Sequence, residues 1–136
     1  MNELKSIKHS HPLKNPLSIC YIYYIKEMQT VNFYKIISAN TVNVYVGSTV
    51  KTLEVRLRKH ENDNKRFLEG RQHYITSFEI LEFKNYSIEL IETKECETKA
   101  DRDTIECMHI INNPNTVNKY LPGRTRAQYR EDNKQQ

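Results

Sequence analysis

The chain has 136 residues, of which 38% are apolar and 28% charged, so it has room for one small domain. Three glycines and four prolines exclude a collagen-like or low-complexity chain. Lys and Arg outnumber Asp and Glu by 21 to 17, and the net charge of +4 permits binding to a polyanion where the positive charge is clustered. The alternative is a basic protein whose charge serves solubility alone.

The cysteines are Cys20, Cys96 and Cys107, an odd number without Cys-x-x-Cys spacing. This pattern argues against a disulfide framework and against a cysteine zinc site. Reduced cysteines predict an intracellular protein, in the cytoplasm or the nucleus. No segment approaches the ~20 consecutive apolar residues needed to cross a bilayer, so no contact with a membrane is expected.

Residues 1–30 are predicted to form an arm, poorly ordered or a non-native extension, because they begin with a polar, basic stretch that contains two prolines. A short β-prone stretch, residues 19–25, follows it. A signal peptide is the alternative, but the stretch is tyrosine-rich and no small-residue cleavage site follows it. Met28 stands just before the expected domain, and a chain beginning there is expected to fold and function.

The expected domain opens with two strands. Residues 33–37 are β-prone, and a polar turn at Asn40 and Thr41 separates them from residues 42–47, where valines alternate with other residues. We therefore predict an antiparallel hairpin.

A helix is predicted over residues 52–67. Thr52 is a suitable N-cap, because its hydroxyl can accept a hydrogen bond from a free amide of the first turn. Leu53, Leu57 and His60 lie on related turns, and Arg56 and His60, four residues apart, share one face of the helix.

The second half of the chain is less regular. Residues 73–83 are ambiguous between helix and strand, whereas residues 87–92 alternate and predict a third strand. A second helix is predicted over residues 98–112, where Thr98 and Asp101 resemble a capping box. Its core face is predicted to consist of Ala100, Thr104, Cys107, Met108 and Ile111.

These elements predict an α/β (α+β) fold with a small three-stranded antiparallel sheet flanked by helices. The domain is expected to span residues 31–122. Residues 123–136 are expected to form a charged C-terminal tail that frays.

Five sequence features follow one another in an order that suggests chemistry. They are the triplet Asn32-Phe33-Tyr34, the segment Tyr45-Val46-Gly47-Ser48-Thr49, the pair Arg56 and His60, then Glu106 and Asn118. This order resembles the GIY-YIG nuclease family, in which two such triplets stand on a hairpin, Arg and His or Tyr on the first helix, and Glu and Asn later. The resemblance covers residues 33–123, and residues 117–125 look like variants seen in large DNA viruses and mobile elements. One departure is Asn32, because the family has a glycine there.

The resemblance implies hydrolysis of a phosphodiester bond with one divalent metal ion. Glu106 would bind Mg²⁺ or Mn²⁺, since a hard cation prefers oxygen and Mg²⁺ keeps several waters. Arg56 would bind a phosphate oxygen through its permanently charged guanidinium. Tyr34 would act as general base or orient the attacking water, which requires a nearby cation because the pKa of a free tyrosine is about 10.

Three further roles follow from the same resemblance. His60 would relay a proton, because the pKa of imidazole lies near neutrality. Tyr45 would hydrogen-bond the site or the substrate. Asn118 would support the geometry near Glu106.

Each of these residues also has an ordinary structural explanation. Tyr34 and Tyr45 could be cross-strand packing partners, and the charged pair on the first helix could form a solvated face. Glu106 could form an ion pair with Arg102, four residues before it, and Asn118 could belong to a turn. These explanations do not account for the common order of the residues.

A basic cluster in and around the first helix predicts DNA as the partner, because phosphate contacts give affinity without reading sequence. Its members are Lys51, Arg56, Arg58, Lys59, Lys65 and Arg66. No separate DNA-reading module is visible, so low sequence specificity, or targeting by a partner protein, is expected. The location expected from the resemblance includes a viral replication compartment, and the oligomeric state stays open.

Two other functions remain open at this point. One is a nucleic-acid-binding module of the same fold that has lost catalysis, which would need the basic helix but not Glu106. The other is a protein-interaction domain in which the tyrosine and arginine cluster is only structural. Cleavage of DNA, binding without cleavage, and no binding at low salt distinguish the three.

Overall fold

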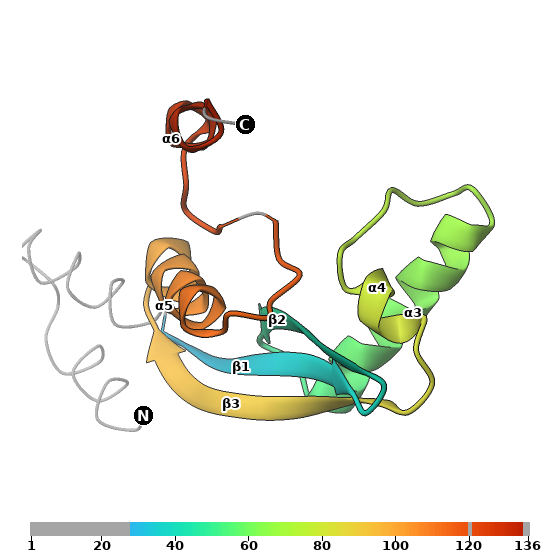
Figure 1. Ribbon diagram of the computed structural model, residues 1–136. Helices are drawn as coiled ribbons and strands as arrows, with labels where there is room; N and C mark the ends of the chain where they lie inside the picture. Colours follow the sequence, from blue (N-terminus) through green and yellow to red (C-terminus); the bar gives the residue numbers. More distant parts are fainter. Residues whose placement is uncertain (1–27, 120, 135–136) are drawn as a thin grey trace, which may run out of the picture.

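The computed structural model describes residues 28–119 and 121–134 and contains a three-stranded antiparallel sheet (Figure 1). Strands β1 (Gln29–Ser38) and β2 (Thr41–Thr49) form the predicted hairpin. Strand β3 (Tyr86–Cys96) pairs with the other edge of β1, which gives the order β2-β1-β3. The predicted fold class is therefore confirmed, and β1 lies at the centre of the sheet.

Within the described residues, four helices accompany the sheet. Two helices, joined by a loop, lie between the hairpin and β3 in the chain, and the other two follow β3 (Figure 1). They are α3 (Leu53–Leu68), α4 (Phe78–Leu81), α5 (Lys99–Asn112) and α6 (Arg126–Asp132).

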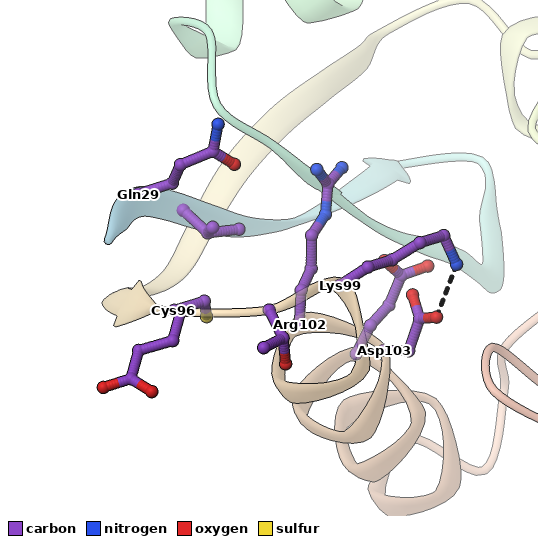
Figure 2. Close-up of a pocket in the computed structure, with 9 residues that line it drawn as sticks. Gln29, Cys96, Lys99, Arg102 and Asp103 are labelled. Carbon is purple, nitrogen blue, oxygen red and sulfur yellow. Dashed lines mark hydrogen bonds and ion pairs between the residues drawn. The ribbon is translucent and has the colours of Figure 1, made fainter. Parts of the chain in front are cut away.

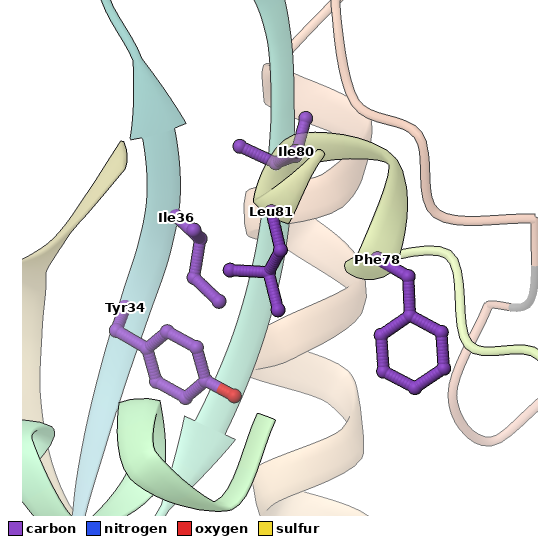
Figure 3. Close-up of a cluster of buried hydrophobic side chains, with 5 residues drawn as sticks. All are labelled: Tyr34, Ile36, Phe78, Ile80 and Leu81. Carbon is purple, nitrogen blue, oxygen red and sulfur yellow. The ribbon is translucent and has the colours of Figure 1, made fainter. Parts of the chain in front are cut away.

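The two faces of the sheet bury different sets of side chains because consecutive residues of a strand point to opposite faces. On one face, Tyr34 and Ile36 of β1 pack against α4, as Figure 3 shows, and against α3. On the other face, Val31 and Phe33 pack with Cys96 and with Ile105 of α5. The sheet is thus covered on both faces.

The predicted helix starts are confirmed by their caps. The Thr52 hydroxyl accepts a hydrogen bond from the amide of Val55 at 3.3 Å. Thr98 and Asp101 form the predicted capping box, with distances of 3.1 and 3.2 Å between side-chain oxygens and backbone nitrogens. Leu53, at the start of α3, packs against the buried core.

The predicted core face of α5 is wrong. Ala100, Thr104, Met108 and Ile111 are exposed, Cys107 is half-buried, and the buried residue of the helix is Ile110. The physical reason is that Arg102 and Glu106 hydrogen-bond to Ser48 of β2, as described below. With these contacts in place, Ile105 and Ile110 are the isoleucines that α5 turns inward.

Smaller differences concern the ends of elements. β1 begins at residue 29, so two residues expected in the arm belong to the sheet, and the rest of the arm, residues 1–27, lies outside the described residues. β3 extends to Cys96 because it pairs along the whole of β1. Residues 73–83 contain the short helix α4, and the tail expected to fray contains α6, capped by Thr125.

Candidate active site

The hydroxyl of Tyr34 is the centre of a buried hydrogen-bond network. Tyr34 is fully buried, and its oxygen accepts a hydrogen bond from Nε of Arg56 at 2.8 Å. Nε2 of His60 lies 2.8 Å from the same oxygen. Arg56 and His60 stand one turn apart on α3, so the helix aims both side chains at the central strand, as their spacing predicts.

His60 is held at its second nitrogen as well. Its side chain is buried, and Nδ1 lies 2.9 Å from the hydroxyl oxygen of Ser77. Burial, followed by the positive charge of Arg56, lowers the pKa of His60 from 6.5 to about 4. The imidazole is therefore neutral at pH 7, and one of its nitrogens is a hydrogen-bond acceptor.

The pKa of Tyr34 is shifted in the opposite direction. Burial and then the neighbouring Tyr45 raise it, and Arg56 lowers it only in part. The phenol is consequently protonated at neutral pH. Tyr34 can thus accept a proton from water only if it gives its own proton away.

Gly47 of β2 lies opposite Tyr34 in the hairpin. A Cβ atom at this position would lie 2.5 Å from the hydroxyl oxygen of Tyr34 and 2.6 Å from the carbon that bears it. Real Cβ atoms do not approach other atoms so closely, so only glycine leaves the tyrosine side chain in this place. This contact explains why the strand carries glycine here.

Tyr45 borders the network on the same face. Its ring centroid lies 5.2 Å from that of His60 and 6.5 Å from that of Tyr34. Burial raises its pKa, and Arg56 is close enough to lower it in part. The packing of the two tyrosines, which the sequence offered as an alternative to catalysis, is present together with the polar network.

Glu106 approaches from α5, on the other face of the sheet. Its Oε2 accepts a short hydrogen bond from the hydroxyl of Ser48 on β2. Arg102 donates from Nε to the same hydroxyl at 2.8 Å and from Nη2 to the Ser48 carbonyl at 3.0 Å. Among the described residues, Arg102 and Glu106 form no direct ion pair, because both bind Ser48 instead.

Glu106 and the tyrosine network lie within electrostatic reach of each other. Burial raises the pKa of Glu106, while Ser48, Arg102 and Arg56 favour its charged form. The charge of Glu106 in turn contributes to the rise in the pKa of Tyr34. Glu106 on one face of the sheet therefore interacts electrostatically with Tyr34 and Arg56 on the other.

A model of the GIY-YIG catalytic domain matches residues 20–120, most of the chain. The chain belongs to the GIY-YIG family. No curated protein and no solved structure matches it. Membership implies nuclease activity on a nucleic acid, and the match begins at residue 20, inside the segment that the sequence assigned to the arm.

Asn118 in this GIY-YIG domain binds the backbone of β2. Its Oδ1 accepts from the amide of Val46 at 2.9 Å, and its Nδ2 donates to the carbonyl of Val46 at 2.7 Å. The side chain thus continues the parallel pairing between Val44 and Thr116, two residues further along each segment. Asn118 supports β2, the strand that carries Tyr45. Ser48, which binds Glu106, lies on the same strand, so Asn118 acts on Glu106 only through β2.

Asn32, which replaces the first glycine of the GIY motif, joins two elements. Its Nδ2 donates to the carbonyl of Lys51 at 3.1 Å, and its Oδ1 accepts from the hydroxyl of Thr93 at 2.8 Å. Lys51 directly precedes the N-cap of α3. The asparagine therefore ties the start of the arginine-bearing helix to β3.

The donor set at Glu106 fits a divalent cation of the kind that GIY-YIG nucleases use. Glu106 is half-buried, and among the described residues its Oε1 has no hydrogen-bond partner. The described chain contains no group of three or more His, Cys, Asp or Glu side chains that could hold a metal ion. One carboxylate with waters and a substrate phosphate is a common Mg²⁺ environment, so Glu106 fits as the single protein ligand.

A cavity of about 680 Å³ lies beside Glu106 at the start of α5 (Figure 2). Arg102 extends along it toward the strands, and an ion pair of 2.6 Å joins Lys99 to Asp103 at its margin. Charges of both signs line it. Glu106 is one of the residues that line this cavity.

The predicted nucleic-acid-binding residues lie on α3 or, in the case of Lys51, just before it. Lys51, Arg58, Lys59, Lys65 and Arg66 are all exposed. Three of them, Arg58, Lys59 and Arg66, line a groove of about 360 Å³. Val55, Asn62 and Asp63 complete its lining. Lys59 forms an ion pair of 3.3 Å with Asp63, which offsets part of its charge. No helix in the described part of the chain is long and apolar enough to cross a membrane.

The sequence motif contains Ser48 but indicates no role for it, and no motif indicates Ser77. Ser48 could have been identified from its place directly after Gly47, whereas Ser77 stands in a segment with no clear periodicity. Arg102 was considered only as an ion-pair partner of Glu106, and its contact with Ser48 needed the fold.

Proposed function

We propose that the protein is a divalent-metal-dependent endonuclease that hydrolyses phosphodiester bonds in DNA with low sequence specificity. The observation that carries the proposal is the Tyr34 hydroxyl held between Arg56 and His60, within electrostatic reach of Glu106. A purely structural tyrosine needs neither a guanidinium nor an imidazole at its oxygen.

In the proposed reaction, Tyr34 takes a proton from the attacking water while its own proton passes to Nε2 of His60. The distance of 2.8 Å between the two atoms suits this transfer. The neutral state of His60 at pH 7 leaves it able to receive the proton. Neither group has to be charged beforehand in the buried site.

Arg56 uses one of its five N–H groups on Tyr34, and its charge attracts the phosphate. Glu106 is proposed to hold Mg²⁺ or Mn²⁺, which would supply positive charge for the phosphate and the leaving oxygen. Tyr45, beside His60, is proposed to hydrogen-bond the substrate. The groove on α3 is proposed to bind the DNA backbone. Contacts with phosphates carry no sequence information, so low sequence specificity is expected.

The test is nicking of supercoiled plasmid DNA with Mg²⁺, with Mn²⁺ and with a chelator. We expect cleavage with either metal and none with the chelator. Glu106→Gln should abolish cleavage and leave DNA affinity nearly unchanged, because the groove on α3 lies on another element. Binding without cleavage in the wild type under every condition would replace the proposal by a binding module, and no binding at low salt would exclude both.

A further inference from the structure

Ser77 is a buried polar residue that the proposed reaction does not use. It is fully buried at the start of α4, where Phe78 and Ile80 anchor the chain in the core (Figure 3). Its hydroxyl oxygen lies 2.9 Å from Nδ1 of His60, 17 residues away in sequence. Among the described residues this is its one side-chain hydrogen bond.

Ser77 does not serve the local purpose for which serine is favoured in its position. It stands at the N-cap of α4, but its backbone is helical, with φ −60° and ψ −25°, and its side chain makes no cap hydrogen bond. Thr52, Thr98 and Thr125, at the corresponding positions of the other helices, all cap. The hydroxyl of Ser77 is thus directed to His60 instead of its own helix.

The contacts from Ser77 through His60 to Tyr34 allow only two arrangements of the protons. A neutral imidazole has one N–H and one acceptor nitrogen, and Arg56 already donates to the oxygen of Tyr34. In the first arrangement, Nδ1–H donates to Ser77 and Nε2 accepts from the phenol. In the second, Ser77 donates to Nδ1 and Nε2–H donates to the phenol oxygen.

Each arrangement leaves one hydroxyl proton without a described acceptor, that of Ser77 in the first and that of Tyr34 in the second. The phenol is the more acidic hydroxyl and the stronger donor, so leaving its proton unpaired in a closed site costs more free energy. The first arrangement is therefore favoured. It is also the arrangement in which His60 can receive the proton of Tyr34.

We infer that Ser77 is a positioning residue whose oxygen accepts the Nδ1–H of His60 and thereby fixes the imidazole tautomer in which Nε2 accepts the Tyr34 hydroxyl. This inference rests on the proposed function for its catalytic meaning, because the tautomer matters to the reaction only if His60 receives a proton. The tautomer itself can be measured independently of any activity.

The first measurement is the ¹⁵N NMR spectrum of the His60 side chain in the wild type at pH 7, assigned through bonds from the backbone. The protonated and unprotonated ring nitrogens have well-separated shifts. We expect Nδ1 protonated and Nε2 unprotonated. Protonation at Nε2 would overturn the inference whether or not the protein cleaves DNA, and no variant is needed for this result.

The second measurement compares Ser77→Ala with Thr76→Ala, a matched removal of the neighbouring hydroxyl, whose oxygen makes no side-chain hydrogen bond in the described chain. Ser77→Ala should mix the His60 tautomers and lower kcat by about 10- to 100-fold with little change in KM, because DNA does not touch Ser77. Thr76→Ala should behave as the wild type. Equal kcat in the two variants would overturn the inference, whereas absence of cleavage in the wild type would count against the proposed function alone.

Discussion

Glycine at position 47 is required by the hydroxyl of Tyr34. The space that a side chain would fill is occupied by the oxygen and the adjacent ring carbon of the tyrosine. At the scale of single residues, the YIG glycine and the GIY tyrosine therefore form one unit. The tyrosine can reach Arg56 and His60 only because β2 has no side chain opposite it.

Gly47→Ala should displace the hydroxyl of Tyr34 and lower cleavage by about 100-fold, since a shift of about 1 Å at reacting groups has an effect of this size. The free energy of unfolding should fall by about 1–3 kcal/mol, as for overpacking in general. Initial nicking rates and urea unfolding measure the two effects. Wild-type cleavage by a folded Gly47→Ala variant would show that the position of this hydroxyl is unimportant.

His60 should make the stability of the protein depend on pH. Its pKa is about 4 in the folded state and about 6.5 in the unfolded chain, so the unfolded chain takes up a proton first as the pH falls. Stability is therefore full above pH 6.5 and is lost as the pH falls toward 4. Between pH 7 and pH 5 the loss from this group should be about 2 kcal/mol.

Urea unfolding of the wild type and of His60→Asn at both pH values measures this loss. The variant should lose less stability than the wild type over the same interval, because every other titrating group is common to both proteins. An equal loss in the two proteins would mean that His60 keeps an ordinary pKa in the fold.

At the scale of elements, β2 is an edge strand whose outer side is covered by pieces of the chain that follow β3. The backbone of residues 115–117 pairs with Val44, the side chain of Asn118 pairs with Val46, and Arg102 binds the carbonyl of Ser48. An edge strand with unpaired backbone groups is prone to pair with another chain. Ser48, whose carbonyl Arg102 binds, is also the residue whose hydroxyl donates to Glu106.

Asn118→Ala leaves the amide and the carbonyl of Val46 without partners and should lower the free energy of unfolding by about 2 kcal/mol. Asn118→Asp keeps the acceptor and loses the donor, so its loss should be intermediate. Asn115→Ala is the control, because its exposed side chain makes no hydrogen bond in the described chain. Urea unfolding ranks the three, and an equal effect of Asn115→Ala would contradict the assignment.

The groove on α3 contains two arginines whose removal should weaken DNA binding. Arg58→Ala and Arg66→Ala should each weaken DNA affinity on any sequence and reduce the slope of log K against log salt by about 0.9 per lost phosphate contact. Lys94→Ala removes an exposed charge from β3 and should change neither quantity. Binding titrations at several salt concentrations decide, and unchanged slopes for both arginine variants would remove α3 from the binding surface.

The parts of the fold that depend on local spacing could be predicted from the sequence. The hairpin follows from the alternation of valines on either side of a polar turn, and the shared helix face of Arg56 and His60 follows from their spacing of four residues. The rotation of α5 could not, because Arg102 and Glu106 fix it through Ser48, far away in sequence. For the same reason an apolar stripe was a poor guide to its core face.

At the scale of the whole molecule, the sheet separates two groups of site residues. Tyr34, Arg56 and His60 meet on one face, whereas Glu106 comes from the helix on the other. The site therefore exists only when both faces are packed. Secondary structure alone could not bring these groups together, so nuclease activity should be lost in any state in which α5 is detached.

The most direct test of one shared site is single-turnover cleavage of a DNA duplex with Mg²⁺ by the wild type, Tyr34→Phe, Glu106→Gln and the double variant. Residues that act together in one reaction give strongly non-additive losses. We expect each single substitution to reduce cleavage severely and the double variant to be no slower than the slower single one. A cleavage rate equal to that of the wild type in either single variant would contradict a common site. So would a double variant whose rate falls by the product of the two single reductions.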